Sequence, residues 1–64
     1  MTWILIIQLT YSTPYGTKIS TDDVEGFQTE KACLSYASME DRRLKKIKSQ
    51  TNLKSWDLMC VRGN

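Results

Sequence analysis

The two cysteines are the residues whose chemistry is easiest to delimit. Cys33 and Cys60 lie far apart in the sequence, and the chain contains no histidine. A structural zinc site needs about four cysteine or histidine ligands, and no histidine can activate either thiol as a nucleophile. We therefore expect neither a metal site nor thiol catalysis. The favoured interpretation is two buried thiols that pack as small apolar side chains, and a disulfide is the alternative.

A basic run is the second candidate for chemistry. Its members are Arg42, Arg43, Lys45, Lys46 and Lys48. On a helix, several of these side chains would project away from the core, where they could bind phosphates of a nucleic acid or a nucleotide. The net charge is only +2, however, and no glycine-rich loop precedes a helix. The favoured interpretation is a solvated helix face. The alternative is a nucleic-acid or nucleotide binder, including an oligomeric nucleotide sponge, that uses Arg42, Arg43, Lys45 and Lys46.

Acidic residues do not supply a catalytic or metal-binding pattern. Asp22, Asp23, Glu25 and Glu30 depart from the spacing of a calcium-binding loop. A chain of 64 residues hides only about 60% of the surface that it exposes when unfolded, which leaves little material for the walls of a catalytic pocket. We expect a protein that is not an enzyme and that carries no cofactor and no metal.

An apolar run opens the chain and must position much of the rest. Residues 2–11 are rich in β-branched and aromatic types, which favour a strand. Apolar side chains occur on both faces of this strand, as is typical of a central position in a sheet. The run is shorter than the ~20 residues of a membrane helix, and no secretory signal pattern is visible. We expect a soluble cytoplasmic protein that does not associate with a membrane.

The next segments predict a turn, an edge strand and a helix. Pro14 and Gly16 mark a turn over residues 12–16. The acidic side chains within residues 17–27 are typical of an edge strand. Thr29 is placed to cap a helix over residues 30–49. The predicted inner stripe of this helix is Cys33, Tyr36, Ala37, Leu44 and Ile47. Glu40 interrupts the stripe, which indicates either a pair with a basic residue or a break in the helix.

A third strand is predicted over residues 55–62, after a connection over residues 50–54. The resulting hypothesis is one small α+β domain over residues 1–64, with the elements in the order β-β-α-β. The short turn makes the first two strands antiparallel. Pairing of the third strand with the first gives a three-stranded antiparallel sheet of order 2-1-3. One helix then packs on one face of this sheet.

The other face of that sheet would expose apolar side chains. Ile4, Ile6, Met59 and Val61 fall on it by strand alternation, and a contiguous apolar patch on a soluble domain is typical of an interface. We expect either a homodimer or a target protein to cover this patch. The alternative is that the second strand and the turn cover it. Tyr15, in the turn, is a further candidate contact residue.

The chain resembles short phage and prophage proteins of uncharacterised function. The likeness rests on the apolar first strand, on the helix start Phe27-Gln28-Thr29-Glu30-Lys31-Ala32-Cys33, and on a last strand that ends Cys60-Val61-Arg62. The resemblance implies a core role for Phe27, a facing pair of cysteines, and no catalytic residues. It also implies an accessory role. The leading hypothesis is therefore a protein that binds and inhibits a host protein, including an anti-CRISPR-like or other anti-defence protein, in the host cytoplasm.

Overall fold

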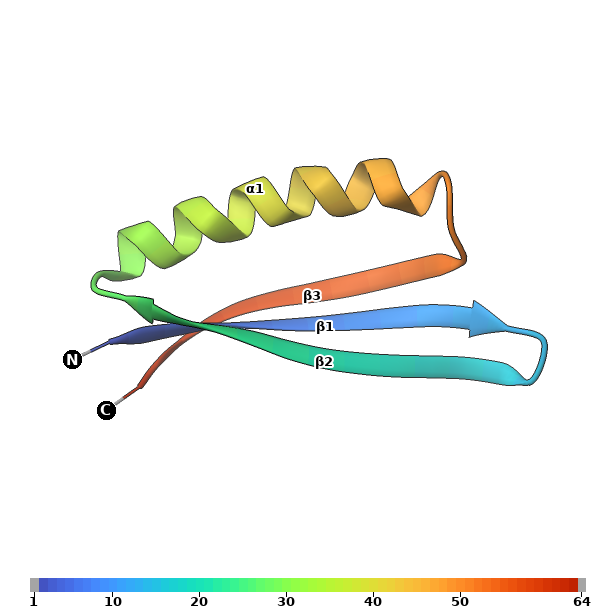
Figure 1. The fold of residues 1–64 in the computed structure, drawn as a ribbon, viewed down its shortest axis with the longest axis horizontal. Coiled ribbons are helices and arrows are strands. Elements are labelled where there is room, and N and C mark those ends of the chain that lie inside the picture. Colours follow the sequence, from blue (N-terminus) through green and yellow to red (C-terminus); the bar gives the residue numbers. More distant parts are fainter. Residues whose placement is uncertain (1, 64) are drawn as a thin grey trace.

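Four elements make up the fold in a computed structural model, which describes residues 2–63. The strands are β1 (Trp3–Thr13), β2 (Gly16–Phe27) and β3 (Leu53–Arg62), and the helix is α1 (Glu30–Lys48). The sheet has the order β2-β1-β3, with β1 antiparallel to both neighbours (Figure 1). The predicted α+β class, element order and strand order are confirmed.

The β1–β2 hairpin is longer than the sequence predicted, because its turn is shorter. Pairing continues to Thr13 opposite Gly16, so the tip consists of Pro14 and Tyr15 instead of residues 12–16. The Thr13 hydroxyl donates a hydrogen bond to the Gly16 carbonyl at 2.7 Å and accepts one from the Tyr15 amide at 3.3 Å. Gly16 has a φ of +126°, a conformation that glycine adopts at low cost.

A β-bulge in β2 sets which side chains face the helix. Trp3 lies opposite Phe27 and Leu5 opposite Val24, so β2 has one extra residue between these pairs. Gly26 has a φ of +98° within this irregular stretch. The bulge lets both Val24 and Phe27 pack against the core cluster.

The helix begins where the sequence predicted and runs without a break. The Thr29 side chain accepts a hydrogen bond from the Ala32 amide at 3.1 Å, which confirms the predicted cap. Glu40 does not interrupt the helix. Its carboxylate binds the Arg43 guanidinium through two hydrogen bonds, at 3.1 and 2.6 Å, and this is the pairing that the sequence offered as one outcome.

The core is small and lies between α1, β1 and β3. Its buried hydrophobic residues are Leu5, Ile7, Cys33, Leu44 and Leu53. Two expectations need correction. Residues 53 and 54 were assigned to the connection, but pairing with Tyr11 places Leu53 in β3 and buries it. Tyr36 was assigned to the inner helix stripe, but it is 36% exposed and its ring contacts Phe27 at a centroid distance of 5.3 Å.

The helix lies over β3 and β1 and leaves most of β2 uncovered (Figure 1). Along β2, only Val24 and Phe27 are half-buried, and the other residues are exposed. Tyr36 is exposed because it contacts Phe27 on β2, the strand that the helix covers least. The two ends of the described chain lie together, where the Gly63 amide donates to the Thr2 carbonyl at 2.8 Å.

Candidate binding surfaces

The sheet face that points away from α1 carries an apolar patch. Leu5 and Ile7 point toward the helix and join the core cluster, so the even-numbered side chains of β1 point to the other face. We call this the open face. Ile4 lies opposite Val61, and Ile6 lies opposite Met59. The structure thus brings together the four residues of the predicted interface. Met59 is 55% exposed, so part of the patch is accessible to a partner.

A shallow hollow adjoins this patch at the β2 edge. It has a volume of about 310 Å³ and is lined by Ile4, Ile6, Val61, Thr21, Asp22 and Asp23. Asp23 lies opposite Ile6 in the strand register. The Asp22 carboxylate accepts a hydrogen bond from the Asp23 amide at 2.9 Å, which orients it. The hollow therefore has an apolar floor and an acidic wall.

Sequence reasoning did not find the acidic wall. Asp22 and Asp23 were weighed against a calcium-binding loop and were otherwise interpreted as charges of an edge strand. The alternation of side chains along β2 puts Asp23 and Asp22 on opposite faces, but it does not say which face. That is decided by the pairing of Asp23 with Ile6. A shift of one residue in that pairing would turn Asp23 to the other face.

Two acidic residues flank the apolar patch on the open face. Asp23 lies on one side of β1, and Asp57 lies on the other side, opposite Gln8. The basic residues of β3 lie near its two ends, Lys54 at the bulge beside Thr10 and Tyr11, and Arg62 next to Val61. Arg62 lies opposite Trp3, whose odd-numbered position in β1 faces the helix side. A partner that approaches the open face therefore meets Asp23 and Asp57.

Tyr15 projects from the hairpin tip and is fully exposed (100%). The two hydrogen bonds of Thr13 brace this tip. An aromatic side chain on a braced turn loses little conformational entropy when a partner contacts it. The tip is thus a second candidate contact, at the opposite end of β1 from the apolar patch.

The basic run lies on α1, but the structure pairs part of it with acidic neighbours. Arg43 binds Glu40, and Lys45 lies 3.2 Å from an Asp41 carboxylate oxygen. Within residues 2–63, Arg42 and Lys46 form no ion pair. They line a hollow of about 320 Å³ together with Met39 and Arg43. Two of the four predicted phosphate contacts are thus already engaged inside the molecule.

Asp41 also ties the helix to β3. The Trp56 indole Nε1 donates a hydrogen bond to Asp41 Oδ1 at 2.9 Å. This bond, together with the neighbouring Lys45 ammonium, lowers the pKa of the Asp41 carboxyl below its ordinary value. The sequence did not predict this contact, because it joins residues 15 positions apart on two different elements.

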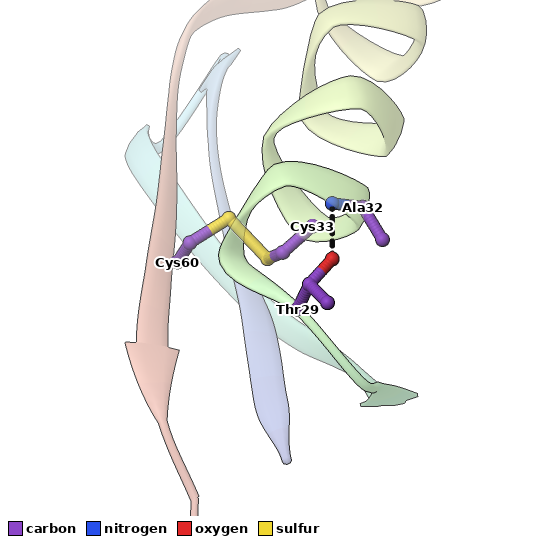
Figure 2. The surroundings of a disulfide bond; sticks show 4 residues. All are labelled: Thr29, Ala32, Cys33 and Cys60. Atoms are coloured by element: carbon purple, nitrogen blue, oxygen red, sulfur yellow. Dashed lines mark hydrogen bonds between the residues drawn. A yellow bond between two sulfur atoms is a disulfide. The ribbon is translucent and has the colours of Figure 1, made fainter.

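The two cysteines form a disulfide that joins the first turns of α1 to β3 (Figure 2). Their Cα atoms are 6.1 Å apart, and Cys33 is fully buried. The structure has the bridged state, so the favoured interpretation of two free buried thiols is wrong and the alternative, a disulfide, is the one observed. The bridge lies beside the Thr29 cap (Figure 2), so the helix start is held by two separate contacts.

A polar hollow lies at the hairpin end of the sheet, where α1 does not reach. It is lined by Tyr11, Thr13, Lys18, Ser20 and Asn52. In the described part of the chain, no group of three or more histidine, cysteine or acidic residues could hold a metal ion. The open face, the hairpin tip and the basic side of α1 are the surfaces that contain the residues singled out by the sequence.

Comparison of the chain with models of protein families, with curated proteins and with solved structures finds no match. No family is assigned, and the resemblance to phage accessory proteins stays a prediction. Any functional argument therefore depends on the surfaces of the chain itself.

Proposed function

We propose that this chain is a non-enzymatic binding domain whose open face takes a partner protein. One observation carries the proposal: the cross-strand pairs Ile4–Val61 and Ile6–Met59 form an apolar patch on the face away from α1, in which Met59 is exposed and the other three residues are half-buried. Fully burying an exposed methionine side chain contributes about 1.5–3 kcal/mol, and a half-buried isoleucine or valine contributes less. A few such side chains, held rigidly by a sheet, provide the centre of a protein interface.

A matched pair of substitutions tests this surface. Met59 is 55% exposed on the open face and Leu34 is 53% exposed on the helix. Met59→Gln and Leu34→Gln thus remove equally exposed apolar side chains from different faces. The immobilised protein is used to capture partners from a bacterial lysate. We expect Met59→Gln to lower capture of a stoichiometric protein by about tenfold, which corresponds to ~1.4 kcal/mol, and Leu34→Gln to leave it unchanged.

The opposite result would remove the open face as the contact. If Leu34→Gln lowers capture and Met59→Gln does not, the helix is the binding surface. Inhibition of a host protein is a further part of the proposal and is supported by the family resemblance alone. Its test is the activity of the captured protein, which should fall when the wild-type domain is added at equal concentration and not when Met59→Gln is added.

The proposed location, the cytoplasm, has a separate test. No helix within residues 2–63 is long and apolar enough to cross a membrane. The Cys33–Cys60 bridge, however, favours an oxidising compartment, since disulfides are rare in the cytosol. Cells that express the protein are lysed directly into denaturant with an alkylating reagent, because Cys33 is buried in the folded protein, and the mass of the protein then distinguishes a cytoplasmic from an oxidising location. Two alkylated cysteines support a cytoplasmic pool with reduced thiols, and none supports the oxidised protein.

The second candidate function is phosphate binding by α1. It is favoured by the hollow that places Arg42 and Lys46 beside Met39. It is weakened by the ion pairs of Arg43 and Lys45 within the helix. A shift assay with DNA and RNA over a salt series tests it, because each phosphate contact steepens the salt dependence. Binding at low salt that is lost in Arg42→Gln and Lys46→Gln would support this function.

A further inference from the structure

We propose that the open face recognises a cationic segment of its protein partner, and that a lysine or arginine side chain of that partner fills the hollow beside β2. The methylene stem of this side chain lies on Ile4, Ile6 and Val61, and its charged head lies at the Asp23 carboxylate on the open face. Asp22, which lies opposite Ile7, adds negative charge at the β2 edge. This inference rests on the proposed function and names the class of partner surface that the same face takes.

The shape of the hollow favours a long side chain with an apolar stem. Its floor is formed by Ile4, Ile6 and Val61, and its wall by Asp22 and Asp23. Lysine and arginine bury their stems along apolar surface while their heads reach a polar rim. A purely apolar side chain would fill the floor but would strip water from the carboxylates without replacing their hydrogen bonds.

The carboxylates are available for such a contact. Within residues 2–63, neither Asp22 nor Asp23 forms an ion pair. Asp22 is oriented by the hydrogen bond that it accepts from the Asp23 amide, and a carboxylate keeps further acceptor sites after one such bond. A cation at the hollow therefore gains charge-assisted hydrogen bonds without breaking an ion pair of the free protein.

The same charges disfavour a second copy packed open face to open face. Such a dimer would bring Asp23 and Asp57 of both copies, which flank β1 on either side, into one interface. Like charges in contact suppress that pairing. They also repel nucleic acid from this face. A partner with basic and apolar side chains satisfies both the patch and its acidic surroundings.

Two matched peptides probe the charge preference directly. One alternates leucine with lysine, and the other alternates leucine with glutamate at the same length. We expect the lysine peptide to shift the backbone NMR signals of Ile4, Ile6, Asp23 and Val61, and the glutamate peptide to leave them unmoved. Equal shifts with both peptides, or shifts confined to α1, would overturn the inference.

Charge-removing variants locate the contact within the face. Asp22→Asn combined with Asp23→Asn removes the acidic wall, whereas Asp57→Asn removes a carboxylate outside the hollow. We expect the double variant to weaken lysine-peptide binding by about tenfold and Asp57→Asn by less than about threefold, since charges act strongly only at close range. Equal losses in both variants would mean a diffuse attraction and no specific side-chain site.

The outcomes separate this inference from the proposed function. If Met59→Gln abolishes partner capture while the double variant captures normally, the open face binds a protein but not through a cation, and only the inference fails. If neither variant affects capture, both fail. Sedimentation of the chain alone tests whether a second copy occupies the open face. A dimer that persists in high salt and is lost in Met59→Gln would place a second copy there and would overturn the inference.

Discussion

Trp56 and Asp41 join the C-terminal half of the helix to β3 through a 2.9 Å hydrogen bond from the indole nitrogen to the carboxylate. Lys45 contacts the same carboxylate at 3.2 Å, and the Lys48 ammonium lies 6.0 Å from the centre of the Trp56 ring. The Cys33–Cys60 bridge holds the other half of the helix. Two cross-links at separate points thus join α1 to β3 in addition to the packing of the small core.

We expect the Asp41 contact to make stability depend on pH. The Trp56 hydrogen bond lowers the pKa of Asp41 in the folded protein, so the unfolded state binds its proton more readily. The stabilisation is complete above the ordinary carboxyl pKa and is lost as the pH falls through the lowered value. Asp41→Asn should therefore destabilise the protein at about pH 7 and have a much smaller effect at about pH 2. Urea unfolding at both values measures this.

Asp57→Asn is the control for the pH experiment. Its carboxylate lies on the open face, opposite Gln8, away from Trp56 and the helix. The difference in unfolding free energy between this variant and the wild type should change less with pH than the difference for Asp41→Asn. An equal pH dependence in both variants would show that overall charge, and not the Trp56 contact, is responsible.

The disulfide should supply a large part of the stability. It closes a loop with a sequence separation of 27, which corresponds to roughly 3–4 kcal/mol on the chain-entropy model. A domain of this size has a total stability of about 3–10 kcal/mol. Replacement of both Cys33 and Cys60 by alanine should therefore lower the free energy of unfolding by several kcal/mol. Urea unfolding of this variant in the absence of reductant measures the loss.

The wild type provides the control for the bridge. Adding reductant should destabilise the wild type to about the level of the double alanine variant, and should leave that variant unchanged. A wild type that is equally stable with and without reductant would mean that the bridge is absent or contributes nothing in solution.

The Thr29 cap should be measurable through a matched pair of variants. Thr29→Ala removes the acceptor of the Ala32 amide and should cost about 1 kcal/mol, which lowers the melting temperature by about 4–8 °C in a small domain. Thr29→Ser keeps the hydroxyl and should restore most of the loss. If serine and alanine destabilise equally, the loss comes from the threonine methyl group and not from the hydrogen bond.

Tyr15 should affect binding without affecting folding. Its side chain is fully exposed, so Tyr15→Ala should change the free energy of unfolding by less than about 0.5 kcal/mol. Capture of the partner protein should fall if the partner reaches the hairpin tip as well as the open face. Thermal unfolding measured alongside capture separates the two effects, and a large drop in melting temperature would contradict the assigned exposure.

Local patterns were sufficient to predict the elements and their order. The apolar first strand, the Thr29 cap and the uninterrupted helix follow from short-range preferences. The predictions are wrong where a contact between two elements decides the bounds of a strand or the burial of a side chain. Leu53 belongs to β3 because Tyr11 lies opposite it, and Tyr36 is exposed because the helix favours β3 over β2. Neither fact can be read from neighbouring residues.

The candidate sites divide in the same way. Ile4, Ile6, Met59 and Val61 could be grouped in advance, because alternation along two strands places each on a known face. The acidic wall could not be predicted in advance. It depends on the register between β1 and β2, which is shifted by a bulge between Trp3 and Leu5. The basic run could be located on α1, but not the ion pairs of Arg43 and Lys45, which depend on side-chain geometry.

The amino-acid sequence alone determined that this chain forms a hairpin, a capped helix and a final strand, and that one sheet face would be apolar, because these properties repeat with the period of each element. Only the tertiary structure decided that Cys33 reaches Cys60, that Trp56 binds Asp41 and that Asp23 lies beside Ile6. Each of these contacts joins residues on different elements, and their meeting depends on strand register and on where the helix lies.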